Sequence, residues 1–144
     1  MKMSLHLYRL IMVILIVIII PIYSCHLFSD SHRPENIKIT GIDTNGNPDL
    51  KDAGGNSAKI FKAKAGKTIN WLLNTNEISS IDSIYKKEAS ANIFIAEPSR
   101  LGHSQNWTAT INSDAKPDEY EDYNIDWTDK DGKKHTYDPR IQVK

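Results

Sequence analysis

The sequence predicts an all-β fold, a single antiparallel β-sandwich of seven or eight strands that follows a hydrophobic leader. Apolar and polar residues alternate along most of the chain after residue 35, which gives each segment one apolar face, as in a half-buried strand. These segments recur at intervals of roughly ten residues, and clusters of Gly, Asn, Asp and Pro separate them. That spacing is typical of a sandwich.

Four segments show the alternation most clearly, and their apolar residues should share one core. In chain order these are Ile37 and Ile39, then Ile69, Trp71 and Leu73, then Trp107, Ala109 and Ile111, and last Tyr123, Ile125 and Trp127. Shorter strands are expected at 59–64 and 92–96, with a final one at 136–144. Residues 76–88 carry isoleucines at spacings that also suit a helix, but their serine and isoleucine content favours a strand.

The segments between these strands have turn composition. Residues 43–49 and 52–56 are rich in Gly, Asn and Asp and are expected to form one long polar connection. The pair Asp131-Gly132 predicts a hairpin tip with a type I′ turn, which needs positive φ at both central residues. Pro139 cannot donate a ladder hydrogen bond and therefore marks a bulge or the entry to the last strand.

The start of the chain has the layout of an export signal. Lys2 and Arg9 precede an apolar run from residue 10 to residue 23, and Ser24 stands just before Cys25. A helix of these 14 residues would cover roughly 21 Å, less than the ~30 Å hydrocarbon core of a bilayer. The Ser24-Cys25 pair resembles the lipobox of bacterial lipoproteins, which implies cleavage before Cys25 and a diacylglycerol on its sulfur. An uncleaved signal-anchor helix is the alternative.

This resemblance divides the chain into a signal peptide at 1–24, a lipid-attachment cysteine with a tether at 25–35, and a sandwich domain at 36–144. It implies a cell-envelope protein that faces the periplasm or the exterior, with the membrane and another envelope protein as partners. Cys25 is the only cysteine, so the domain cannot form an internal disulfide and depends on its packed core. Without Lys2 and Arg9, 16 basic residues face 18 acidic ones, so no nucleic-acid partner is expected.

Two short segments, 65–71 and 123–127, resemble strands of cupredoxin-like and immunoglobulin-like sandwiches in their rhythm of apolar and aromatic residues. A blue-copper site needs two imidazoles, a thiolate and a weak axial ligand such as methionine. No cysteine or methionine follows Cys25 in the sequence, so the resemblance implies a sandwich without the metal, and no cofactor is expected.

The chain contains no Gly-x-Ser-x-Gly, His-Glu-x-x-His or phosphate-loop motif, so we expect a binding or accessory module rather than an enzyme. Tyr120, Tyr137 and His103 are the candidates for a ligand or partner surface. A hydrolase with a dispersed site at His103, Asp122 and His135 is one alternative.

A calcium-stabilised surface or adhesion domain is the other alternative. Its ligands would be the alternating oxygen donors of one loop, which are Asp43, Asn45, Asn47 and Asp49. An EF-hand needs Gly at the sixth position and Glu at the twelfth, where this chain has Pro48 and Gly54. The alternative is that the same side chains form ordinary Asx-turns, in which they hydrogen-bond to the nearby backbone.

Overall fold

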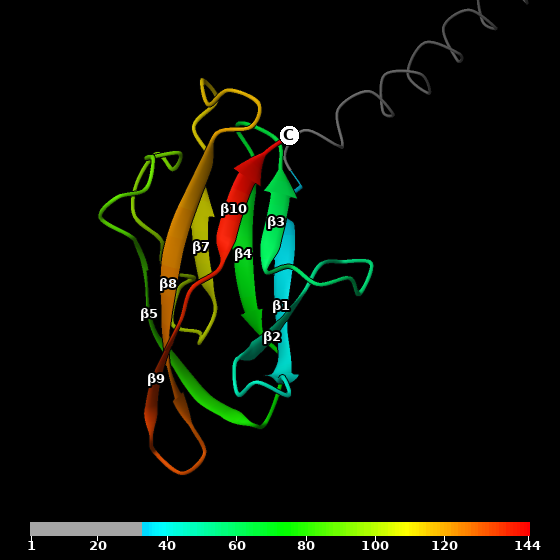
Figure 1. Cartoon of the computed structure of the whole chain (residues 1–144), viewed down its shortest axis with the longest axis vertical. Coiled ribbons are helices and arrows are strands. Elements are labelled where there is room, and N and C mark those ends of the chain that lie inside the picture. Colours follow the sequence, from blue (N-terminus) through cyan, green and yellow to red (C-terminus); the bar gives the residue numbers. More distant parts are fainter. Residues whose placement is uncertain (1–32) are drawn as a thin grey trace, which may run out of the picture. The chain divides into compact units, whose positions relative to one another are not determined.

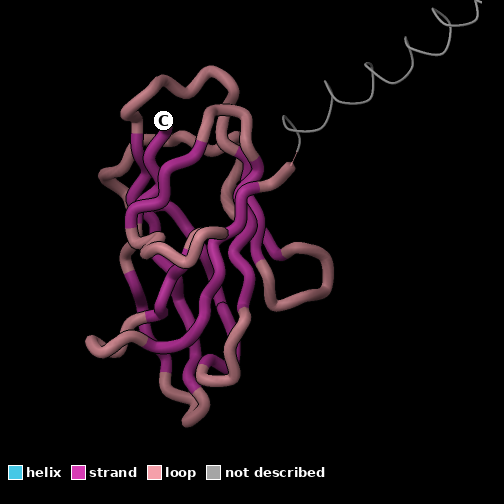
Figure 2. Tube along the Cα trace, turned by 90° about the vertical axis from the view of Figure 1, so that its right-hand side faces the viewer, coloured by secondary structure: helices cyan, strands magenta, loops and turns pink. Residues whose placement is uncertain are grey.

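The computed structural model describes residues 33–144, which fold into two facing β-sheets (Figure 1). The signal-like leader, Cys25 and the tether up to residue 32 lie outside the described residues. All regular structure from residue 33 onward is strand, as Figure 2 shows in magenta, and this confirms the all-β sandwich. No helix able to cross a membrane occurs in this part of the chain.

The first sheet contains five strands. Their order across the sheet is β2 (Pro48–Lys51), β1 (Glu35–Ile42), β4 (Thr68–Leu73), β7 (Trp107–Thr110) and β6 (Ser99–Arg100). The second sheet has the order β3 (Ile60–Ala63), β10 (Arg140–Val143), β8 (Tyr120–Asp129) and β5 (Ile78–Lys86). The strand β9 (Lys134–Tyr137) pairs with the second half of β8.

The sheets are mixed, which corrects the expectation of purely antiparallel pairing. β1 runs parallel to β4, and β3 runs parallel to β10. The chain leaves the first sheet after β2, adds β3 to the second sheet, and returns with β4 beside β1 in the same direction. These parallel pairs differ from the antiparallel sheets of the constant-type immunoglobulin sandwich.

The expected strands are largely present, with ten in all in the described residues. The segment 76–88 is a strand, β5, as favoured. The expected strand at 92–96 is wrong, because only an isolated bridge joins Phe94 to Ile111 there. The expected long polar connection is interrupted by β2, and the last segment is two strands separated at Asp138-Pro139.

The core lies between the sheets and is built from the inward residues of the alternating segments. Trp71, Trp107 and Trp127 are all buried, which confirms their expected place. The indole N–H of Trp71 donates a hydrogen bond of 3.0 Å to the buried hydroxyl of Tyr123, and the two rings meet edge to face. Tyr123 is part of the same apolar cluster, which burial and aromatic packing hold together without a disulfide.

Three hairpin loops share one geometry. In the loops that start at Asp43, Asp52 and Asp129, the N–H of the first residue donates to the carbonyl of the fifth, and the carbonyl of the first residue accepts the N–H of the fourth residue, a glycine. Gly46, Gly55 and Gly132 all have φ near +80°, at 81°, 83° and 80°. This is a type I turn followed by a glycine bulge. The expected type I′ turn at Asp131-Gly132 is therefore wrong, because only the glycine has positive φ.

Candidate functional site

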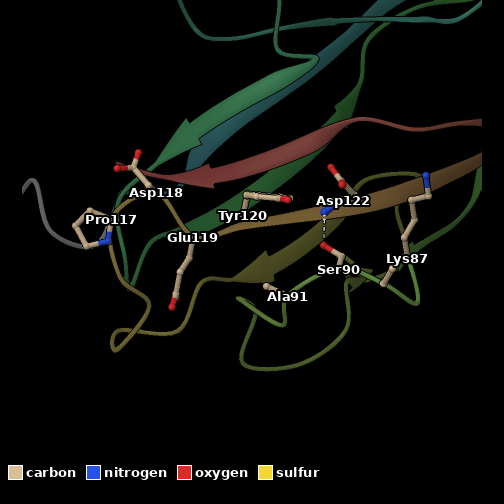
Figure 3. A pocket seen from close by; sticks show the side chains of 9 residues that line it. Lys87, Ser90, Ala91, Pro117, Asp118, Glu119, Tyr120 and Asp122 are labelled. Atoms are coloured by element: carbon tan, nitrogen blue, oxygen red, sulfur yellow. Dashed lines mark hydrogen bonds between the residues drawn. The ribbon is translucent and has the colours of Figure 1, made fainter.

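An open depression of about 570 Å³ lies at the beginning of β8, where the second sheet meets the loop after β5 (Figure 3). Side chains from both elements and from the segment before β8 line it. They are Lys87, Ala89, Ser90, Ala91, Pro117, Asp118, Glu119, Tyr120 and Asp122. Tyr120 is the only aromatic residue among them and retains 42 % of its surface exposed.

Tyr120, Arg140 and Asp122 form a single unit, here called the Tyr120 platform. The Arg140 guanidinium lies 3.8 Å from the centre of the Tyr120 ring. Its Nε and Nη2 donate to the two carboxylate oxygens of Asp122 at 2.6 and 3.0 Å. This bidentate hydrogen bond lowers the pKa of Asp122 below its usual value. The guanidinium is therefore held in place between an aromatic ring and a carboxylate.

The strand register explains how the platform forms. Even-numbered residues of β8 face outward and odd-numbered residues face the core, as the alternating burial of the strand shows. Arg140 pairs directly with Asp122, and Gln142 pairs with Tyr120, so Arg140 reaches both side chains on the outer face. Pro139, just before β10, fixes the point at which the last strand enters.

Two further depressions lie on the same outer face. One of about 330 Å³ borders the Asp122–Arg140 pair on its other side and includes Lys59, Ile60 and Asp138. Lys87 is ion-paired with Asp138 there, and this hydrogen bond raises the pKa of Lys87. The other depression, of about 560 Å³, lies along β3. The outer face of β3, β10 and β8 is thus the part of the described surface on which these hollows gather.

The clustered acidic residues Asp118, Glu119, Glu121 and Asp122 predict a solvated charged loop, but Glu121 is buried in β8. It is only 1 % exposed, and its Oε2 accepts the N–H of Ile93 at 2.9 Å. Burial raises the pKa of Glu121, although the backbone hydrogen bonds that it accepts oppose the rise. The N–H of Asp122, the next residue of β8, donates to the Ser90 hydroxyl at 2.6 Å. These two hydrogen bonds connect the loop after β5 to the sheet. A charge at an inward position of β8 was the available sequence signal.

The three residues predicted for a ligand surface have different surroundings. Tyr120 lies at the depression, as described. Tyr137 is half-buried and packs against the core, because odd-numbered residues of β9 share the inner side of β8. His103 is exposed in the loop between β6 and β7. The structure does not bring these three side chains to one place.

The candidate calcium residues take part in local hydrogen bonds. Oδ1 of Asp43 accepts the N–H groups of Asn45 and Asn47 at 2.8 and 2.9 Å, and these bonds lower the pKa of Asp43. Asp49 lies in β2, where it pairs with Lys51 at 3.1 Å and accepts the Thr40 hydroxyl. Residues 33–144 contain no group of three or more His, Cys, Asp or Glu side chains arranged to hold a metal ion. Calcium binding here stays a prediction, which the melting temperature with and without chelator tests.

The three residues of the hydrolase alternative lie apart in the fold. Asp122 is on the outer face and is paired with Arg140. His135 stacks on inward-facing Trp127 with ring centres 4.3 Å apart, and its Nε2 is 2.8 Å from Oδ2 of Asp129. His103 lies in the loop after β6. The hydrolase with a dispersed site stays a prediction.

No protein-family model matches this chain, and the search of curated proteins found no match either.

Proposed function

We propose that the chain is a lipid-anchored protein of the bacterial cell envelope whose sandwich domain is a non-catalytic binding module. The observation that carries the binding role is the Tyr120 platform. Tyrosine and arginine are among the residues enriched at the energetic centres of protein interfaces. Here both are on one exposed face, and the Asp122 carboxylate already orders the arginine, which lowers the entropic cost of binding.

The anchor is proposed from the sequence alone. Cys25 follows a signal-like run, and Glu35, where β1 begins, is ten residues further along. Ten extended residues span at most roughly 35 Å, so a lipid on Cys25 would hold the domain close to a membrane surface. The partner is accordingly proposed to be another envelope protein.

The intact mass of the mature protein tests the anchor. Cleavage before Cys25 together with the added mass of a diacylglycerol and fatty acyl chains is the expected result. A mass that includes Met1 and an unmodified thiol would refute the lipoprotein and support the signal-anchor alternative.

Site-specific photo-crosslinking in intact cells tests the binding role. A crosslinker at position 120 should give one adduct of reproducible mass, because the platform would contact the partner. The matched control is position 38, which is exposed on the outer face of the first sheet. Adduct formation at both positions, or at neither, would contradict a partner site at the platform.

A further inference from the structure

The free edge of β3 is a second surface of the domain, next to the Tyr120 platform, since Ile60 of β3 pairs with Arg140 of β10. Within residues 33–144, β3 pairs only with β10, so its other edge has no strand neighbour in this part of the chain. The N–H groups of Arg140 and Lys144 donate to the carbonyls of Lys59 and Ala63 at 2.8 and 2.9 Å. Alternate residues of a parallel strand bond to the same neighbour, so the backbone N–H and C=O groups of Ile60 and Lys62 point to the free edge.

No strand of the described residues pairs with this edge, whereas two other edges of the sandwich are partly covered. The carbonyl of Ile81 in β5 accepts hydrogen bonds from the Arg100 guanidinium and the Trp107 indole at 3.0 and 3.3 Å. The edge of β2 is joined to Ser57 by a bridge at Lys51. A depression of about 560 Å³ runs beside β3 and includes Ile60 and Lys62.

The side chains along β3 specify what kind of segment would fit. Ile60 is 56 % exposed, which leaves an apolar side chain available on the outer face. Lys59, Lys62 and Lys64 are all exposed, and none of them takes part in an ion pair in the described part of the chain. Asp52 is the one acidic residue in the depression, and its carboxylate is occupied by hydrogen bonds from Gly54 and Asn56 in its own loop.

We infer that an extended, acidic peptide segment of a partner protein binds as an additional strand along β3. The backbone groups of Ile60 and Lys62 would supply the ladder hydrogen bonds. The three lysines would attract acidic side chains, and Ile60 would contact an apolar residue of the segment. Pairing of β3 with a second copy of itself is disfavoured, because it would place these unpaired lysines against one another.

The probes are two synthetic peptides of seven residues, acetylated and amidated, one alternating Glu with Val and the other Lys with Val. Each is titrated into the ¹⁵N-labelled full chain in nanodiscs of zwitterionic lipid, at low and at physiological salt. The acidic peptide should shift the amide resonances of Ile60 and Lys62 and slow their hydrogen exchange. Its affinity should exceed that of the basic peptide by about tenfold at low salt and fall as salt is added.

Two variants separate the contributions of the backbone and of the charge. Ile60→Pro removes an N–H that points to the free edge, where proline is tolerated, and should abolish the change at the Lys62 amide. Lys62→Glu should weaken the preference for the acidic peptide, because only Lys59 and Lys64 remain, and this readout does not depend on the proline variant folding. Lys130→Glu, in the exposed β8–β9 loop, is the matched charge control and should bind as the parent protein does.

Equal affinity for both peptides, or unchanged Ile60 and Lys62 amide resonances, would overturn the inference. The lysines would then serve only to prevent unwanted pairing of a solvent-exposed edge strand. Concentration-dependent dimerisation that shifts the same amides would overturn it in favour of a second copy. Since neither peptide experiment involves Tyr120, failure here leaves the crosslinking test of the platform unaffected.

Discussion

At the scale of single residues, Arg140 organises the outer face of the second sheet. Its guanidinium stacks on Tyr120 and is held by both oxygens of Asp122. Lysine could not replace it, because an ammonium group cannot make a planar, bidentate contact and stack on a ring at once. The position is thus specific for arginine for a geometric reason, although the residue lies at the surface.

Inside the sandwich, a single hydrogen bond between Trp71 and Tyr123 joins two buried aromatic side chains. Tyr123→Phe keeps the ring but leaves the Trp71 indole N–H without its acceptor in the core. A buried donor left unpaired costs about 1–3 kcal/mol, so we expect the free energy of unfolding to fall by that amount. Urea denaturation measures it.

The control for this variant is Tyr137→Phe, which removes a hydroxyl from a half-buried tyrosine that packs against the same core. Its effect should stay within about 0.5 kcal/mol, as is usual for substitutions near the surface. Equal losses in the two variants would contradict a specific role for the Trp71–Tyr123 bond.

At the scale of elements, the three loops that start at Asp43, Asp52 and Asp129 repeat one solution to turning a hairpin. In each, Oδ1 of the aspartate accepts the N–H groups of the third and fifth residues, which lowers the pKa of the aspartate. For Asp52 and Asp129 the largest causes of the lowered pKa are the side-chain hydrogen bonds with Asn56 and His135. The sequence pattern is an aspartate followed three positions later by glycine, so the turn is encoded in five residues.

The glycine of this pattern provides a prediction. Gly132→Ala should lower the free energy of unfolding by about 1–2 kcal/mol, because alanine is strained at φ near 80°. A Cβ at this position would meet nothing within 4 Å, so the loss would come from the backbone alone. Gly132→Asn should lose less, since asparagine tolerates the left-handed region. Thermal denaturation of both variants checks the order, and equal losses would contradict it.

The elements that the sequence predicted are those with local signals. A period of two placed Trp71 and Trp127 in the core and β4, β7 and β8 in the sheets, because the apolar face of a strand must be buried. β2 was missed because Leu50 and Pro48 are its only buried residues and its other side chains are polar. The parallel pairs and the contact of Arg140 with Asp122 were not predictable, since register between distant strands depends on the whole fold.

At the scale of the whole molecule, Glu121 joins a loop, a sheet and the core. Its carboxylate accepts the N–H of Ile93, whose side chain is buried in the same cluster as Phe94. Glu97 raises its pKa further, whereas Lys86 and the N–H groups of Ile93 and Phe94 lower it. The loop after β5 therefore closes over the sandwich by burying one ionisable group, and the charge of that group should affect global stability.

The sign of this effect follows from linkage. A carboxyl whose pKa is higher in the folded state than in the unfolded state binds its proton more tightly when folded. The contribution of Glu121 is therefore most favourable below its unfolded pKa, and it declines as the pH rises through the folded value. Asp82 and Asp122 have lowered pKa values, so their carboxylates stabilise the folded state above the unfolded pKa. This stabilisation is lost as the pH falls below about 4.

Glu121→Gln should remove the loss of stability that accompanies rising pH, because an amide can accept the Ile93 N–H without a buried charge. The loss of stability at low pH, which comes from Asp82 and Asp122, should remain. We expect the melting temperature of the variant to exceed that of the parent protein by several degrees at pH 7 and to approach it near pH 4. Differential scanning calorimetry between pH 4 and pH 8 measures both curves. Glu88→Gln, an exposed residue of the same loop, is the matched control and should follow the parent protein at every pH. A constant offset between the Glu121→Gln and parent curves would show that ionisation of Glu121 does not control stability.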